Sequence, residues 1–215
     1  PGDAVTLFDG LGTSAQAEIL SIARGQVVVR LNPASRRVDP PAAIAITLMQ
    51  AVTKPQSFDW ILQKAGELGA TAIVPVLSER VVWRADRTDP AIKLERWRAI
   101  AIGAAKQCGA NRIPELAPAT NFADLLPTLG QYSPCLLGAL RPNTRPMRET
   151  LAETRNAMPK SIALLVGPEG DFTEAETNAA IAAGAMPVSF GPRVLRAETA
   201  ALFGLSALLY EFDRQ

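Results

Sequence analysis

The hydrophobic pattern divides the chain into two parts. In residues 1–38 the stretches AVTLFDG, AQAEILSIA and GQVVVRLN are short and largely alternating, and turn residues such as Asp9-Gly10 and Arg24-Gly25 separate them. Alternation with a period of two, broken by tight turns, favours a small β-meander or part of a barrel. Because this segment is too short to bury a core of its own, we expect it to belong to a larger unit.

From Ala43 onward, continuous apolar runs alternate with segments of helical spacing. Runs such as AIAITLMQA and SIALLVG have the composition of strands that are buried on both faces. Helices are predicted between them, with start and stop signals at Gly69, Asp89, Pro90, Gly109 and the capping pair Thr173 and Glu176. The alternation over residues 43–212 predicts an α/β domain with a mainly parallel sheet.

The last predicted helix, ETAALFGLSALLYEF, is strongly apolar. Its residues at a/d-like spacing are Leu202, Leu205, Leu209 and Phe212. Such a stripe is expected in the core, although the same face would also suit a dimer interface.

Three of the predicted strands end in turns that contain glycine: LLGALRP, LLVGPEGDF and VSFGPRVLR. Ligands of open α/β sheets bind beyond the carboxyl ends of the strands, and glycine lets the backbone approach a ligand closely. The turns match neither the dinucleotide fingerprint nor the P-loop. They indicate either one pocket lined largely by backbone or ordinary chain reversals, and the pattern leaves both open.

Composition narrows the possible chemistry. The chain has no His and two Cys, which excludes Ser-His-Asp and Cys-His catalysis and His-ligated zinc. No metal site is expected, and the few cysteines favour a reduced, cytoplasmic setting. No apolar stretch is long enough for a membrane span, and no signal peptide is apparent. The chemistry must use carboxylates, Arg, Lys, hydroxyls and backbone groups, or be carried by a cofactor.

Net charge is only +1, yet Arg greatly outnumbers Lys. The guanidinium fork suits phosphates and base edges, although a GC-rich genome produces the same bias. The segment SERVVWRADR mixes Arg with Trp, which suits RNA binding and equally suits a solvated loop.

The motif GPEGDFTEAE followed by FGPRVLRAETA closely resembles the signature of the RsmE family. Members of this family are SPOUT-class methyltransferases that modify N3 of a uridine in small-subunit (16S) ribosomal RNA. The resemblance continues upstream through KPQSFDWILQKAGELGATAIVPVLSERVVW, and PGDAVTLFDG looks like the middle of the family's PUA-like barrel.

The resemblance implies a partial PUA-like, RNA-binding β-barrel over residues 1–38 and a SPOUT methyltransferase domain over residues 39–215. The parallel sheet of the second domain would end in a C-terminal trefoil knot that binds S-adenosylmethionine. The protein would work as a cytoplasmic homodimer on ribosomal RNA, without a metal or a membrane. The chain also departs from the family pattern: Lys106 stands where an acidic residue is usual, Ala110 where a basic residue is common, and Asp171 where a second glycine is frequent.

Site residues follow from the matched motifs. The resemblance implies that the catalytic pair is Arg196 and Glu198, which would otherwise form an ion pair at a helix start. The expected cofactor-binding residues are Leu137, Gly138, Ala139, Val166, Gly167, Pro168, Glu169, Gly170, Phe190, Gly191, Val194, Leu195, Thr199 and Ala200. The expected RNA-binding residues are Arg80, Arg84, Arg112 and Arg193.

Two other functions are compatible with the sequence. One is a non-catalytic RNA-binding module that uses the barrel and the Arg/Trp segment, with purely structural glycine turns. The other is a SPOUT methyltransferase with a different RNA target, because cofactor loops do not encode the target.

Overall fold

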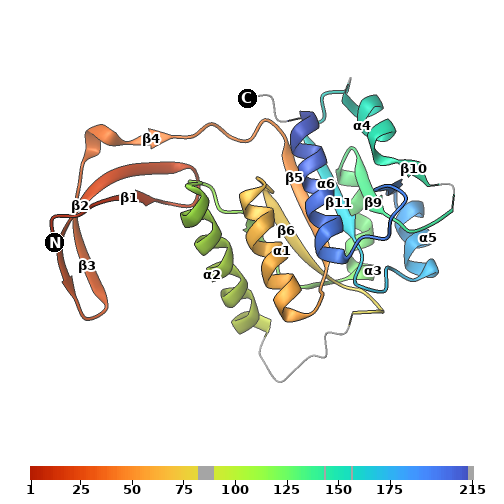
Figure 1. Ribbon diagram of the computed structural model, residues 1–215, viewed down its shortest axis with the longest axis horizontal. Helices are drawn as coiled ribbons and strands as arrows, with labels where there is room; N and C mark the ends of the chain where they lie inside the picture. The colour runs from red at the N-terminus through yellow and green to blue at the C-terminus, as the bar shows by residue number, and fades with distance from the viewer. Residues whose placement is uncertain (82–89, 143, 156, 213–215) are drawn as a thin grey trace.

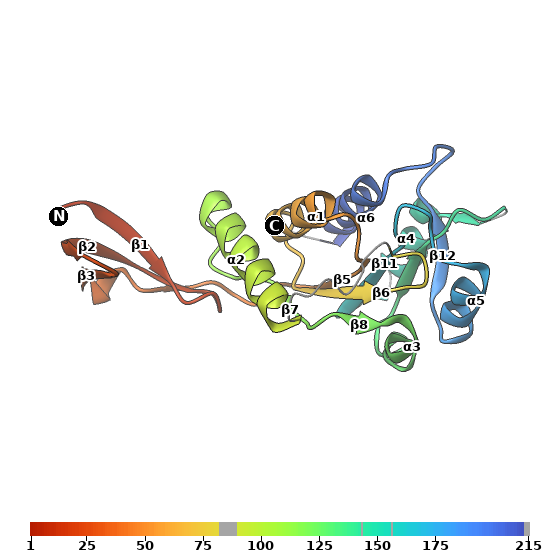
Figure 2. The same ribbon diagram turned by 90° about the horizontal axis from the view of Figure 1, so that it is seen from below.

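The computed structural model describes residues 1–81, 90–142, 144–155 and 157–212, which form an antiparallel sheet followed by an α/β unit (Figure 1). The N-terminal sheet projects to one side, beyond helix α2 (Pro90–Cys108), so the molecule is elongated (Figures 1 and 2). Within the sheet, β1 (Ala4–Phe8), β2 (Thr13–Ala23) and β3 (Gln26–Leu31) pair in that order, and β4 (Arg37–Val38) pairs with β2. The predicted antiparallel strands and turns are therefore confirmed.

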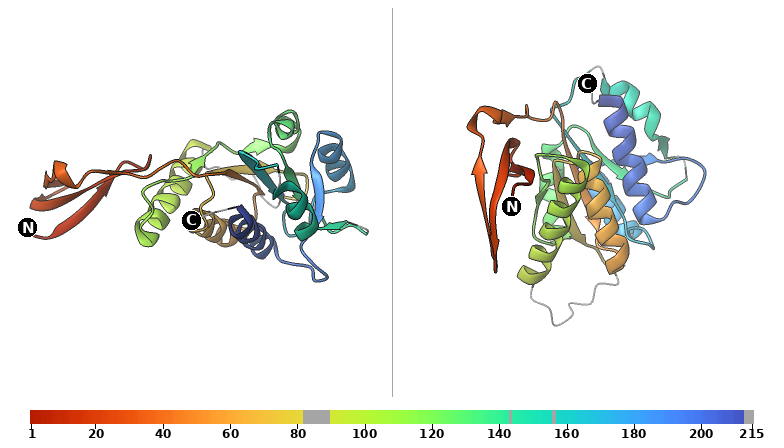
Figure 3. Two further views of the ribbon diagram at one scale, coloured as in Figure 1. Left: turned by 90° about the horizontal axis from the view of Figure 1, so that it is seen from above. Right: turned by 60° about the vertical axis from the view of Figure 1, so that its left-hand side comes forward.

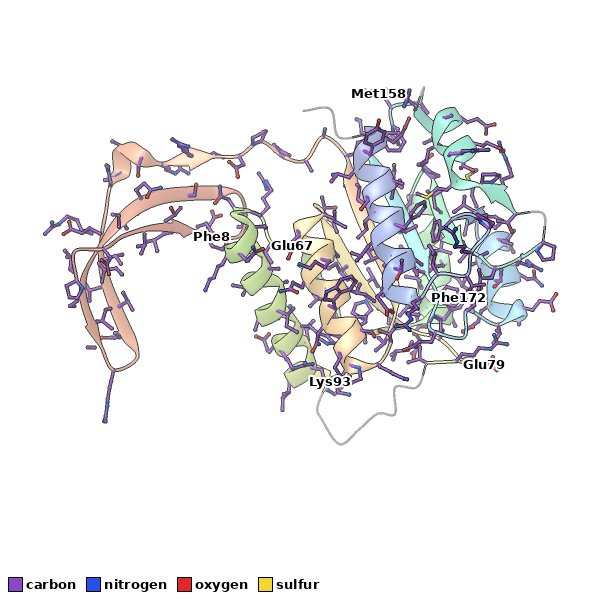
Figure 4. All side chains as sticks on the ribbon, in the orientation of Figure 1. Phe8, Glu67, Glu79, Lys93, Met158 and Phe172 are labelled. Atoms are coloured by element: carbon purple, nitrogen blue, oxygen red, sulfur yellow. The ribbon has the colours of Figure 1, made fainter. Side chains whose placement is uncertain are left out.

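The N-terminal sheet has almost no core. Among residues 1–38, Ala17 is the only buried apolar residue, whereas Ile22 and Val27 are 63% and 58% exposed. Figure 4 shows the contrast, with side chains standing apart along this sheet and crowding together over the α/β unit. As the sequence suggested, these strands do not bury a core by themselves.

A short backbone junction ties the N-terminal sheet to the end of α2. Gly12 N donates to Asn111 O (3.0 Å), and the guanidinium Nη2 of Arg112 donates to Asp39 O (2.8 Å). Gly12 has φ +105°, and a Cβ there would lie 2.6 Å from Cζ of Arg112. Glycine is therefore required at this position for the Arg112 side chain to cross the junction.

The α/β unit contains a parallel sheet, as predicted. Its strand order is β10-β12-β9-β11-β5-β6-β7, with β8 also paired to β6, and every one of these pairings is parallel. The bounds are β5 (Ala45–Ala51), β6 (Ala72–Leu77), β7 (Glu115–Leu116), β8 (Thr120–Asn121), β9 (Cys135–Gly138), β10 (Arg145–Pro146), β11 (Ser161–Val166) and β12 (Met186–Ser189). The two-residue strands β7, β8 and β10 have no pattern of their own and were not predicted.

Helices cover both faces of this sheet (Figures 2 and 3). One hydrophobic cluster lies under α1 (Pro55–Glu67), α2, α4 (Met147–Arg155) and α6 (Ala197–Phe212). A second lies on the other face under α3 (Phe122–Leu125), the 3₁₀ turn Leu126–Gln131 and α5 (Glu174–Ala182). The central strands are thus buried on both sides, which explains their continuous apolar runs.

The helix ends follow the predicted signals where they are described. Gly69 has φ +74° directly after α1, and Gly109 has φ +76° after α2. Thr173 and Glu176 form the predicted reciprocal capping box of α5. Asp89, the predicted cap of α2, lies outside the described residues.

The buried face of α6 differs from the predicted stripe. Leu205 and Phe212 are buried as expected, but Leu202 and Leu209 are only partly buried, and Gly204 and Leu208 take their places. The helix is rotated this way because Gly204 lets its backbone lie directly on β11, where a Cβ would meet Cδ2 of Leu164 at 2.6 Å. None of the helices in the described ranges is long and apolar enough to cross a bilayer.

Candidate functional site

The loops that follow β9, β11 and β12 meet in one pocket at the carboxyl edge of the sheet. The space between these loops is about 560 Å³, a figure that includes the part open to solvent. Its lining residues are Gly138, Ala139, Leu140, Val166, Gly167, Pro168, Glu169, Asp171, Ser189, Phe190, Gly191, Arg193, Val194, Leu195, Ala197 and Ala200. The three glycine turns therefore converge, as the pocket hypothesis required.

Two glycines leave no room for a side chain in this pocket. A Cβ on Gly138 would lie 2.7 Å from Cε2 of Phe190, in the facing loop. A Cβ on Gly167 would lie 2.7 Å from Oδ1 of Asp171 and 3.1 Å from two backbone atoms. The pocket wall is consequently made of closely packed backbone, which offers N–H and C=O groups to a ligand.

The loop after β11 is held in place by the neighbouring strand ends. The Glu169 Oε1 atom accepts a hydrogen bond from Lys54 N (3.1 Å), the residue that precedes α1 and has no side-chain cap of its own. Arg80 Nη1 donates to Gly170 O (2.7 Å). The sequence signal for these contacts was weak, because the partners lie 115 and 90 residues apart.

A buried amide supports the same loop from beneath. Gln50, fully buried at the end of β5, donates from Nε2 to Ala51 O (3.0 Å) and more weakly toward Val166 O and Gly167 O (3.5 and 3.4 Å). Its Oε1 atom has no hydrogen-bond partner within the described structure. Because carbonyls surround Nε2, exchanging the two amide ends would place oxygen against oxygen, so this orientation is the favourable one.

Phe172 anchors the far end of this loop in the core. It is 4% exposed and packs against Phe122, with ring centroids 5.1 Å apart. The segment after β6 is fastened to the start of α5 as well, since the Glu79 backbone N–H donates to Glu176 Oε1 (2.8 Å). The pocket loops thus rest on a fixed base.

Most of the expected cofactor residues line the pocket. The exceptions are Leu137, which is fully buried behind the wall, and Gly170 and Thr199, which are exposed outside it. The pocket also includes residues that the sequence reasoning did not assign to it. These are Leu140, Asp171, Ser189, Arg193 and Ala197.

The expected catalytic pair lies at the pocket's rim. Arg196 is exposed and Glu198 half-buried at the start of α6, next to lining residues Leu195 and Ala197. Within the described chain neither side chain makes a hydrogen bond or an ion pair, so the alternative of an Arg196–Glu198 ion pair is not observed.

The expected RNA-binding arginines are dispersed. Arg193 lines the pocket, Arg80 holds Gly170, and Arg112 lies at the junction with the N-terminal sheet. Arg84 lies outside the described residues. Of the three described side chains, Arg80 and Arg193 adjoin the pocket loops, and Arg112 lies at the separate junction.

A second hollow adjoins the pocket and shares Ser189, Phe190 and Gly191 with it. Its apolar walls include Phe203, 46% exposed, and Tyr210, 90% exposed, on α6. Phe190 and Phe203 are in ring contact with centroids 5.6 Å apart, so the pocket wall and this apolar surface are continuous.

Nucleophilic and metal chemistry find little support in the described residues. They contain no group of three or more metal-ligating side chains. Burial raises the pKa of the Cys135 thiol to about 12, so this cysteine stays protonated near neutral pH. The arrangement is suited to binding a small molecule by backbone groups beside an exposed arginine.

Comparison with known proteins identifies the family. A family model described as an RNA methyltransferase domain matches residues 40–209. Ribosomal RNA small subunit methyltransferase E from Bacillus subtilis is 30% identical over 99% of this chain and 83% of its own length. The protein of that name from Synechocystis is 35% identical over 97% of this chain and 67% of its own length.

Solved structures agree with these matches. A putative methyltransferase from Legionella pneumophila, in complex with bound cofactor SAM, is 33% identical with a TM-score of 0.87 and covers 97% of this chain and 83% of that one. A ribosomal RNA small subunit methyltransferase E from Neisseria gonorrhoeae, bound to S-adenosyl methionine, is 32% identical with a TM-score of 0.83. The match covers 98% of this chain and 84% of that one. The fold, the matched model and these relatives together show that the chain belongs to the ribosomal RNA small subunit methyltransferase E (RsmE) family.

Proposed function

We propose that this chain transfers a methyl group from S-adenosylmethionine to N3 of a uridine in 16S ribosomal RNA. The observation that carries the proposal is the single pocket formed by the three glycine turns. Two solved relatives with at least 32% identity hold S-adenosylmethionine. The choice of uridine N3 rests on the family resemblance.

The pocket suits this cofactor because its walls are backbone that a side chain would block. Gly138 and Gly167 let the loops pack closely around the pocket, because a Cβ at either position would meet Phe190 or Asp171. When bound, S-adenosylmethionine supplies an electrophilic methyl group on its sulfonium, so the protein mainly positions the two reactants. The apolar lining residues Val166, Leu195 and Ala200 would exclude water from the reacting centre.

We assign Arg196 and Glu198 to the acceptor base. The exposed Arg196 guanidinium at the pocket rim, which has no partner among the described residues, would face a carbonyl oxygen of the uracil and stabilise the negative charge that develops there. Glu198 would accept the N3 proton, directly or through water. Since N3 lies on the pairing edge, the target base must be unpaired or flipped out of its helix.

The finer architecture is also part of the proposal. Residues 1–38 would be part of a PUA-like, RNA-binding barrel, and residues 39–215 a SPOUT domain whose C-terminal part is threaded into a trefoil knot. The sheet order supports the knot, because β12 pairs with β9 while α6 returns to pack on β11 and β5. Family membership supports the barrel, whose exposed apolar side chains need a further covering.

We further propose that the working form is a cytoplasmic homodimer. The exposed Phe203 and Tyr210 on α6, together with Val194 (77% exposed), form an apolar surface beside the pocket. A second copy seated there would complete the open side of the cofactor site. RNA phosphates or bases would be contacted by Arg80, Arg84 and Arg193. Arg112 donates from Nη2 to Asp39 O and would contact RNA through its other guanidinium N–H groups.

The test is methylation of small-subunit ribosomal RNA by the purified protein with radiolabelled S-adenosylmethionine, followed by mapping of the modified nucleotide. We expect one N3-methylated uridine. RNA binding without cofactor binding would instead identify a non-catalytic RNA-binding module. Methylation of another RNA or another atom would keep the methyltransferase assignment and refute its specificity.

A further inference from the structure

Asp171 stands out among the pocket residues for its backbone conformation. Its φ is +59°, in the left-handed region that non-glycine residues rarely adopt. A glycine, which is frequent at this position in the family pattern, adopts that conformation without strain. The chain therefore keeps a less favourable residue here, a cost that contacts of its side chain would have to offset.

The carboxylate of Asp171 bridges two loops of the pocket. Its Oδ2 atom accepts a hydrogen bond from Leu140 N (3.2 Å), in the loop after β9. Its Oδ1 atom accepts from Phe172 N (2.8 Å), in its own loop after β11. Charged acceptors make the stronger class of hydrogen bond, so this side chain fastens the two loops to each other.

The surrounding packing fixes the carboxylate in that place. Asp171 N donates to Pro168 O (2.9 Å), which closes the turn, and Gly167 lies directly against Oδ1. The nearby Arg141 side chain is occupied by Asn178 (2.9 Å) and Glu174 (3.7 Å). The Asp171 carboxylate is thus directed at backbone N–H groups at the pocket wall.

Both bridged loops line the proposed cofactor site. Leu140, Asp171 and Gly167 are all wall residues, and the third loop, after β12, meets the first through Phe190 and Gly138. Fixing one loop against the other before the ligand arrives lowers the ordering entropy that binding would otherwise cost. The contacts of the β11 loop with Lys54 and Arg80 fasten it to the segments that follow β5 and β6. Neither contact involves the loop after β9.

We propose that Asp171 is a positioning residue of this chain, which holds loop 138–142 against loop 167–171 and so preorganises the pocket for S-adenosylmethionine. The inference rests on the proposed function for the identity of the ligand. It assigns Asp171 no contact with the reacting atoms.

Two substitutions separate the carboxylate from the backbone conformation. Asp171→Gly removes both hydrogen bonds while relieving the left-handed strain, so the fold should be as stable as before. Asp171→Asn tolerates the left-handed region and keeps one acceptor oxygen. The matched control is Asp9→Asn, because Oδ1 of Asp9 also accepts from two loop N–H groups, Leu11 (2.7 Å) and Thr13 (2.9 Å), in the distant N-terminal sheet.

The first measurement is the cofactor dissociation constant by calorimetry, together with the melting temperature. We expect Asp171→Gly to weaken S-adenosylmethionine binding about tenfold, the scale of losing one charge-assisted hydrogen bond. Asp171→Asn should fall between it and the wild type, and Asp9→Asn should bind as the wild type does. In steady state, KM for the cofactor should rise while kcat at saturation stays within about twofold, because the acceptor site is unchanged.

The second measurement is hydrogen exchange of the Leu140 amide without cofactor, which tests the bridge independently of any ligand. We expect faster exchange in both Asp171 variants and no change in the control. Unchanged exchange at Leu140, or wild-type cofactor affinity in a folded Asp171→Gly protein, would overturn the inference. If the wild-type protein itself bound no S-adenosylmethionine, the proposed function would fail, while the Leu140 result would still decide whether the bridge exists.

Discussion

Replacing Gly204 by Ala should destabilise the fold, although the same change in most helices is stabilising. Gly204 lies in the middle of α6, where Ala is favoured over Gly by about 1 kcal/mol in intrinsic helix propensity. Its Cβ, however, would lie 2.6 Å from Cδ2 and 3.2 Å from Cδ1 of Leu164. The closest contact is about 1 Å shorter than ordinary carbon–carbon contact.

The outcome depends on whether Leu164 can move. This side chain is fully buried in β11 between α6 and the rest of the core, so its displacement disturbs neighbours on all sides. Overpacking of this kind typically costs about 1–3 kcal/mol, and a fully buried site belongs to the upper half of that range. We therefore expect Gly204→Ala to lose about 1–2 kcal/mol net, which corresponds to a fall of roughly 3–6 °C in melting temperature.

Gly103 provides the matched control. It lies in the interior of α2, and a Cβ there would meet no atom within 4 Å apart from its chain neighbours and the backbone of its own helix. Gly103→Ala should gain the propensity term alone, about 1 kcal/mol, and raise the melting temperature by roughly 2–4 °C. Thermal and urea unfolding of the two variants should therefore shift in opposite directions. Equal stabilisation of both would refute the close contact between α6 and β11.

Three further predictions concern the site and its surroundings. Arg196→Ala should lower the single-turnover methylation rate by roughly a hundredfold while changing cofactor affinity much less, and Arg196→Lys should restore only part of the rate; near-normal turnover would show that Arg196 takes no part in catalysis. Cys135 should resist alkylation at pH 8 while the exposed Cys108 reacts, as read by mass spectrometry. Because burial raises the pKa of Cys135 from 9.0 to about 12, its protonated thiol favours the folded state fully below pH 9, and that contribution is lost as pH rises from about 9 to 12. Phe203→Glu should convert a dimer into monomers in light scattering at micromolar concentration, and a wild-type protein that is already monomeric and active would contradict the proposed interface.

Local chemistry was enough to predict the elements whose causes are local. The capping box of Thr173 and Glu176 and the stop at Gly69 each depend on residues a few positions apart, and both were confirmed. The convergence of the three glycine turns could also be expected, because the carboxyl ends of parallel strands share one edge of the sheet.

Features that depend on distant partners could not be predicted in this way. Nothing near Asp171 indicates that its carboxylate accepts from Leu140, 31 residues earlier in the chain. Gly204 packs against Leu164 on the buried face of α6, and leucine spacing alone identified only Leu205 and Phe212 of that face. The family signature supplied the cofactor and the proposed catalytic pair, which the spacing of residues did not.

The cap that Glu169 provides for α1 has a consequence for synthesis of the chain on the ribosome. Lys54 emerges 115 residues before Glu169, and the first turn of α1 contains no acidic residue that could take its place. The Lys54 N–H at the start of the nascent helix therefore has water as its partner until the GPEG turn has been translated. We expect this end of α1 and the pocket loop to reach their final form in the same late step, because the Lys54–Glu169 hydrogen bond joins them.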